Sequence, residues 1–175
     1  MIFKETKLGG SYIISLDKIE DERGFFARSF CVSEFQDRGL NATIKQCNIS
    51  FNKKKYTLRG MHFQIKPYEE TKIVRCTSGA IYDVIIDLRK DSATYKQYFA
   101  IELNSNNRDM LYIPEGIAHG FITLADNTEV VYQMSGYYSP EHASGVRWDD
   151  SAFEIKWPCM PKVISDKDSN YTNWE

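Results

Sequence analysis

Short segments rich in β-branched and aromatic residues recur at regular intervals through the middle of the chain. Turn formers such as "TSG" (77–79), "NSNNRD" (104–109) and "PEG" (114–116) separate them. Strands of this length and spacing, without helical patterns between them, are typical of an antiparallel sandwich or barrel rather than of βαβ units. The pattern predicts an all-β fold with strands over 58–64, 72–76, 80–88, 98–103, 110–113, 120–124 and 129–134.

One short helix is expected near residue 34. Ser33 can cap its first turn, Gln36 occupies the capping-box position, and Gly39 can end it in the left-handed conformation. No repeat or flexible linker divides the chain. We therefore expect a single domain over residues 1–175, with an irregular C-terminal tail from about residue 159.

Composition excludes several classes of partner. The 175 residues contain 22 Lys and Arg against 24 Asp and Glu, so no nucleic-acid partner is indicated. No signal peptide or 18-residue apolar run is present, which predicts a cytoplasmic chain without membrane contact. The four cysteines form no CxxC pair, and reduced thiols are expected.

A histidine occurs within the strand pattern "LRGMHFQ" (58–64). Because side chains alternate along a strand, His62 is expected to share a face with Gly60 and Gln64, and Arg59 to point the other way. Gly60 leaves space beside the imidazole. A histidine with an unperturbed pKa near 6.5 suits general-base chemistry at neutral pH.

The same alternation places two further reactive groups on inward faces. Tyr132 shares its face with Val130 and Met134, and such apolar surroundings would keep the phenol protonated. Lys72 opens a strand that continues inward with Val74, and a buried lysine is costly unless it meets negative charge. A base, an acid and a cation are thus available, although ordinary packing or surface roles for all three stay open from the residues alone.

The chain contains, in order, "DERGFFARSF" (21–30), "QCNIS" (46–50), "LRGMHFQ", "KIVRCTSGAIYDVIIDLRKDS" (72–92), "LYIPEGIAHGF" (111–121), "EVVYQMSGYYSP" (129–140), "GVRWDD" (145–150), "IKWP" (155–158) and "ISDKD" (164–168). These segments resemble the dTDP-4-dehydrorhamnose 3,5-epimerase family, cupin-fold enzymes of deoxysugar biosynthesis. The resemblance implies a cupin-type jelly-roll barrel with one or two short helices. It also implies a homodimer with exchanged N-terminal strands and a reaction that needs no cofactor and no metal.

The resemblance also implies roles for particular residues. A base dyad of His62 and Asp168, a proton-donating Tyr132 and an enolate-stabilising Lys72 form the catalytic set, with Asp166 as an alternative carboxylate. The residues implied in substrate binding are Arg23, Phe26, Gln46, Asn48, Arg59, His119 and Tyr138.

The chemistry fits these residue types. The implied substrate is a nucleotide-linked 4-keto-6-deoxyhexose, and a hydrogen at C3 or C5 is acidic because the C4 ketone can accept charge as an enolate. Inversion needs a base on one face of the ring and an acid on the other. Two segments depart from the family pattern, Arg28 in "RGFFARSF" and Glu69-Glu70-Thr71 before the lysine.

Three other functions remain open from the sequence. An epimerase could act at C3 or C5 alone, on a sugar carried by another nucleotide. A non-catalytic sugar-nucleotide-binding cupin could use the same barrel. A metal-dependent cupin is disfavoured, because such sites usually need a His-x-His pair, which this chain lacks.

Overall fold

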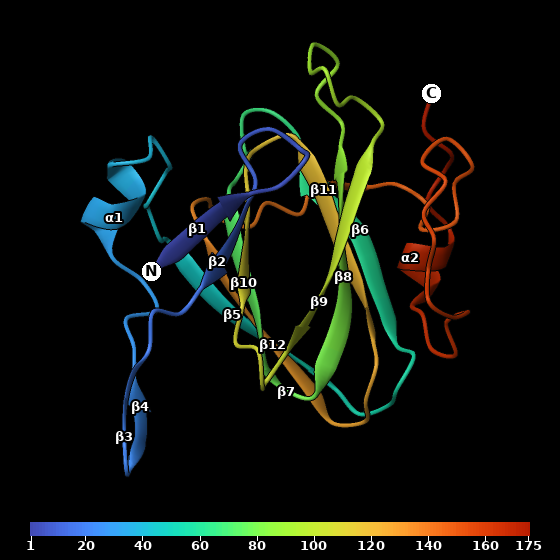
Figure 1. Ribbon diagram of the computed structural model, residues 1–175. Helices are drawn as coiled ribbons and strands as arrows, with labels where there is room; N and C mark the ends of the chain where they lie inside the picture. Colours follow the sequence, from blue (N-terminus) through green and yellow to red (C-terminus); the bar gives the residue numbers. More distant parts are fainter.

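The computed structural model describes residues 1–175, and antiparallel strands make up most of its regular structure (Figure 1). Two sheets face each other. The larger has the order β1 (Ile2–Glu5), β2 (Tyr12–Ser15), β10 (Met110–Ile113), β7 (Lys72–Ser78), β12 (Thr128–Met134) and β5 (Gln46–Asn52).

The second sheet has five strands in the order β13 (Ala143–Gly145), β6 (Leu58–Gln64), β11 (Ile117–Thr123), β8 (Ala80–Asp87) and β9 (Tyr98–Asn104). The predicted all-β architecture is confirmed, and each predicted strand is present. Strands β1, β2, β5 and β13 of these sheets were not predicted. Among the predicted strands the main difference is β11, which begins at Ile117 rather than at residue 120. Gly116, with φ +77, completes the preceding turn, so the chain is extended from the next residue onward.

The core lies between the two sheets and follows the predicted alternation. Val74 and Cys76 of β7, Val130 of β12 and Phe121 of β11 are at most 2% exposed and belong to one apolar cluster. Burial of such side chains contributes roughly 1.5–3 kcal/mol each. The residues between them in sequence, such as Ile73, point to the outer faces.

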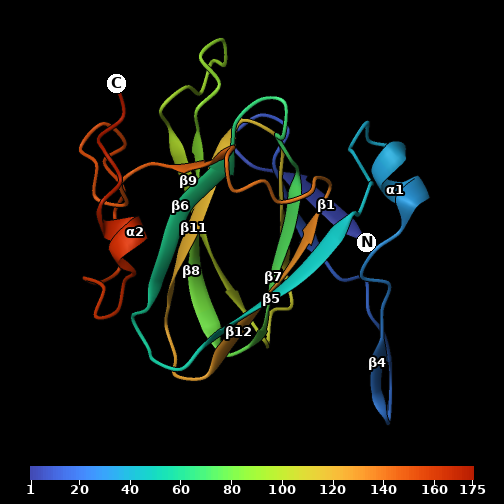
Figure 2. The ribbon, with the colours of Figure 1, turned by 180° about the vertical axis from the view of Figure 1, so that it is seen from behind.

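Each outer face has its own apolar cover. Helix α1 (Val32–Gln36) places Phe35 against Ile14, Ile73 and Met110 on the six-stranded sheet. On the opposite side of the barrel, the C-terminal segment packs against the five-stranded sheet, as the view from behind shows (Figure 2).

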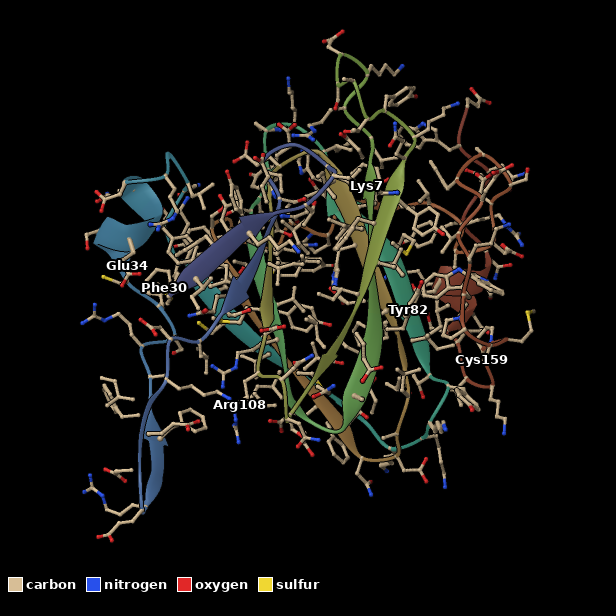
Figure 3. The ribbon with its side chains drawn as sticks, in the orientation of Figure 1. Lys7, Phe30, Glu34, Tyr82, Arg108 and Cys159 are labelled. Atoms are coloured by element: carbon tan, nitrogen blue, oxygen red, sulfur yellow. The ribbon has the colours of Figure 1, made fainter.

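The expected helix at residue 34 is present, but the predicted cap is wrong. Cys31 is the N-cap and makes no side-chain capping bond, whereas Ser33 lies inside the helix and its hydroxyl contacts the Cys31 thiol at 3.2 Å. Glu34, in the middle of α1 (Figure 3), accepts a hydrogen bond from the N-terminal ammonium at 2.9 Å. Gly39 has the predicted left-handed conformation, with φ +69.

Two segments lie outside the barrel. Strands β3 (Ile19–Asp21) and β4 (Gly24–Phe26) form a hairpin that extends away from the sheets (Figures 1 and 2). After β13 the chain is irregular except for helix α2 (Asp166–Ser169), which lies beside β6. Neither helix is long and apolar enough to cross a membrane.

Strand β6 contains a bulge. Its register with β11 pairs His62 with His119 but Arg59 with Phe121, so β6 has one residue more than β11 over this stretch. Gly60 lies within it at φ +136, against the backbone of Gly120. An extra residue reverses the side-chain alternation, and the bulge therefore turns Arg59 to the same face as His62.

The bulge makes Gly60 a sensitive position. A Cβ atom there would lie 2.5 Å from the Gly120 Cα atom, and the backbone conformation is one that other residues rarely adopt. We expect Gly60→Ala to lower the free energy of unfolding by at least about 2 kcal/mol, measured by urea denaturation. Gly9→Ala is the matched control, because nothing lies within 4 Å of its added Cβ atom. Equal stability of the two variants would contradict this account of the bulge.

Candidate active site

A cavity of about 400 Å³ opens at one end of the barrel, between the two sheets. This volume falls within the usual range for small-molecule sites. Eight of the residues singled out from the sequence line it: Asn48, Arg59, His62, Lys72, His119, Tyr132, Tyr138 and Asp168.

The polar side chains continue the inward rows of the core. Along β7 the row runs from Cys76 through Val74 to Lys72, and only Lys72 reaches the cavity. Tyr132 follows Val130 on β12 in the same way. Lys72 and Tyr132 therefore come from the six-stranded sheet, whereas His62 comes from the sheet that faces it.

His62 is paired with a carboxylate from the C-terminal segment. Its Nε2 atom lies 2.7 Å from Asp168 Oδ1, and Asp168 Oδ2 accepts the Gly60 N–H at 3.2 Å. The Ser165 hydroxyl caps α2 by accepting the Asp168 N–H. Burial alone would raise the pKa of Asp168, but these hydrogen bonds outweigh it, and the pKa is lowered. The structure places Asp168, and not Asp166, against the histidine.

Lys72 is buried, and its ammonium contacts two oxygen atoms. Its Nζ atom lies 3.4 Å from Glu70 Oε1 and donates to the His62 carbonyl oxygen at 3.4 Å. Burial lowers the pKa of Lys72, and the negative charge of Glu70 opposes this shift. Burial likewise raises the pKa of Glu70, against the effect of Lys72.

A second histidine–carboxylate pair lies deeper. His119 Nε2 is 2.7 Å from Asp83 Oδ1, and both residues are buried. The His119 ring meets the Tyr132 ring edge to face, with centroids 6.0 Å apart. Burial, assisted by the negative charge of Asp83, raises the pKa of Tyr132, so its phenol is neutral across the physiological range.

The position of Arg59 differs from the one that strand alternation predicts. Strict alternation put it opposite His62, but the bulge in β6 brings it into the same cavity, where its Nε atom donates to Asn52 Oδ1 at 2.7 Å. No turn signal in "LRGMHFQ" marks the extra residue apart from Gly60 itself.

Three of the singled-out residues do not line the cavity. Gln46 lies at its edge, where Oε1 accepts the Tyr138 N–H at 2.6 Å. Arg23 and Phe26 lie on the β3–β4 hairpin, away from the cavity of their own chain, and Arg23 pairs with Asp21. Arg28 is also remote and donates to Glu34 of α1 at 3.2 Å.

Sequence reasoning missed four polar residues near the reactive groups. Asp83 shares its inward row with Ile81 and Ile85, and a carboxylate in an apolar row is a signal that could have identified it. Glu70, Lys167 and Tyr171 line the cavity. Glu70 precedes β7, Lys167 lies in α2 and Tyr171 follows α2, in segments that carry no strand pattern. The structure brings together no group of three His, Cys, Asp or Glu residues that could hold a metal ion.

Comparisons with known proteins agree with this geometry. Residues 5–175 match the family model described as dTDP-4-dehydrorhamnose 3,5-epimerase. A relative with that name from Methanothermobacter thermautotrophicus is 41% identical over 172 residues, which cover 97% of this chain and 92% of the relative.

Solved structures also resemble this chain over nearly its whole length. The crystal structure of dTDP-4-dehydrorhamnose 3,5-epimerase from Bacillus anthracis, with TDP and PPi bound, superposes with a TM-score of 0.95 at 39% identity and covers 99% of both chains. An epimerase from Legionella pneumophila in complex with dTDP-4-keto-L-rhamnose has a TM-score of 0.91 at 31% identity, over 98% of this chain and 92% of the other. The chain belongs to the dTDP-4-dehydrorhamnose 3,5-epimerase family, whose cupin-like fold it shares.

Proposed function

We propose that this chain is an isomerase that inverts C3 and C5 of a dTDP-linked 4-keto-6-deoxyhexose, the reaction for which its family is named. One observation carries the proposal: a histidine–carboxylate dyad and a neutral phenol come from facing sheets into a single cavity. Two groups so arranged can act on opposite faces of a sugar ring between them.

His62 is the proposed base. With Nε2–H donating to Asp168, the lone pair of Nδ1 is free to take a proton, and Nδ1 makes no hydrogen bond within the protein. The carboxylate holds the ring in this tautomer and stabilises the imidazolium that forms.

Lys72 is the proposed electrostatic partner of the enolate. Removal of a proton from C3 or C5 moves negative charge to the C4 oxygen. A buried ammonium interacts with this charge more strongly than an exposed one, because water screens it less.

Tyr132 is the proposed acid. Its raised pKa keeps the phenol protonated, so it can return a proton to the face opposite His62. Each inversion is then one proton removed by His62 and one proton delivered by Tyr132, and the scheme uses no cofactor.

The nucleotide is expected to lie on the side of the cavity where Arg59 and Asn48 are found. A guanidinium suits diphosphate recognition, because its planar fork matches the phosphate oxygens. The relatives from B. anthracis and L. pneumophila were solved with TDP and with a dTDP-sugar, which supports dTDP as the nucleotide.

We further propose a homodimer in which the β3–β4 hairpin reaches the partner's cavity. This accounts for Arg23 and Phe26, which are implied in substrate binding yet lie far from the cavity of their own chain. Ile19 is 72% exposed and Phe26 74% exposed on this hairpin, and β5, at the edge of its sheet, exposes Ile49 and Phe51. Exposed apolar groups of this size favour an interface.

The cytoplasmic location stays a prediction.

The reaction is tested in D₂O with dTDP-4-keto-6-deoxyglucose, by NMR detection of deuterium at C3 and C5. We expect incorporation at both carbons, and His62→Ala to slow it at least about 10³-fold because the base is lost. Asp168→Asn should slow it by up to roughly 10⁴-fold, since the neutral amide stabilises the imidazolium less and no longer selects the Nε2–H tautomer. Incorporation at one carbon would identify a mono-epimerase, and binding without incorporation a non-catalytic module.

The Tyr132→Phe variant tests the role of the acid separately from that of the base. Because His62 remains, deuterium should still enter the substrate with retention, while inversion at one or both carbons falls at least about ten-fold. The measurement is the ratio of exchange to inversion from the NMR coupling constants. An unchanged ratio would rule out Tyr132 as the acid.

The exchanged hairpin is tested by complementation. His62→Ala and Arg23→Ala variants, each of low activity, are mixed, unfolded and refolded together. If Arg23 serves the partner's cavity, mixed dimers contain one complete site, and activity should rise to about one quarter of wild type. Activity no higher than the mean of the two separate variants would show that Arg23 does not act in the partner.

A further inference from the structure

We propose that Glu70 is a positioning residue for the proposed reaction: it holds Lys72 charged and aimed at the developing enolate oxygen. Glu70 belongs to the segment that departs from the family pattern. The inference rests on the function proposed above and deepens it.

Glu70 is buried at the end of the turn that leads into β7. Its side chain is 2% exposed and that of Lys72 is 10% exposed, with 3.4 Å between Oε1 and Nζ. A carboxylate buried this deeply needs partners, because isolation from water is costly. Glu70 has two, since Oε2 also accepts a hydrogen bond from Gln64 Nε2 at 3.1 Å.

Gln64 links this pair to the segment that carries Tyr138. Its Nε2 atom also donates to the Tyr137 carbonyl at 3.1 Å, and its Oε1 atom accepts the Ser139 N–H at 2.7 Å. Gly136 leaves room for Glu70, because an added Cβ atom would lie 3.0 Å from the Glu70 Cβ atom. The glutamate is therefore fixed from three sides and is not free to turn away from the lysine.

The other nearby carboxylates are already paired. Asp168, which also lines the cavity, is held by His62, and Asp83 is held by His119. The residues paired with Lys72 on the neighbouring strands are apolar, Met134 on β12 and Ile113 on β10. The neutral phenol of Tyr132 and, from the facing sheet, His62 line the same cavity. Glu70 thus supplies the negative charge that opposes the burial of this ammonium.

The geometry also aims the lysine. The Lys72 ammonium donates to the His62 carbonyl and forms an ion pair with Glu70. An ammonium has three donors, so donor capacity is left for a ligand. Without Glu70, burial would act unopposed, Lys72 would lose its proton at lower pH, and a neutral amine would stabilise an enolate less.

The test is the pH dependence of kcat for the wild type, Glu70→Gln and Glu69→Gln. In Glu70→Gln the alkaline limb should move to lower pH by at least about one unit, so kcat at pH 9 falls about ten-fold relative to wild type. KM should change little. Glu69→Gln is the matched control: the same substitution one residue away, at a side chain that does not line this cavity. Superposable profiles for all three proteins would overturn the proposal.

A second measurement does not depend on activity. NMR titration of ¹³C-labelled lysine, with the Lys72 signal assigned by its loss in Lys72→Arg, should show a lower titration midpoint in Glu70→Gln than in wild type or Glu70→Asp. An unchanged midpoint would contradict the inference even if the chain proved inactive. A shifted midpoint without deuterium incorporation by the wild type would instead refute the proposed function alone.

Discussion

The hydrogen bond between His62 and Asp168 joins two parts of the chain that are 106 residues apart in sequence. It fixes the imidazole on β6 and at the same time attaches α2 to the five-stranded sheet. The second oxygen of Asp168 accepts the N–H of Gly60, so the carboxylate also holds the bulge. The proposed base, the bulge that turns Arg59 inward and the attachment of α2 all involve this one carboxylate.

The chemistry of the cavity follows from the two-sheet architecture. An inversion needs proton transfer on opposite faces of a ring, and two facing sheets provide opposite walls without any special loop. His62 and His119 come from one wall, Lys72 and Tyr132 from the other. Deeper in the barrel the same rows are apolar, which raises the pKa of Tyr132 and makes the paired charges strongly interacting.

Much of this could be predicted from residue patterns. The central strands other than the start of β11 were predicted from residue type and turn formers. The inward positions of Lys72 and Tyr132 follow from alternation, which holds wherever a strand is regular. Alternation alone put Arg59 on the face opposite His62, whereas the resemblance put it in the substrate site, and the bulge beside Gly60 accounts for the second placement. Ser33 was taken for a helix cap because its residue type suits the position, but the N-cap is Cys31 and the helix begins two residues earlier than such a cap requires.

Other features depend on contacts between distant segments. Glu70 stands in a polar turn, and nothing in its neighbours indicates that Gly136 and Gln64 enclose it. The pairing of His119 with Asp83 comes from the register of β11 with β8, which no local pattern determines. Arg23 and Phe26 lie on a hairpin that extends away from the sheets, and only the proposed dimer would bring them to a cavity. The single-domain division, expected because no repeat or linker divides the chain, stays a prediction.

The central claim is that the sugar ring lies between a base on one sheet and an acid on the other. A crystal structure of the Tyr132→Phe variant with a dTDP-4-keto-6-deoxyhexose tests it most directly. The account predicts His62 Nδ1 on one face of the ring, the residue 132 side chain on the other, and the C4 oxygen within hydrogen-bond distance of Lys72 Nζ. A ring with both side chains on the same face, or with its C4 oxygen remote from Lys72, would contradict it.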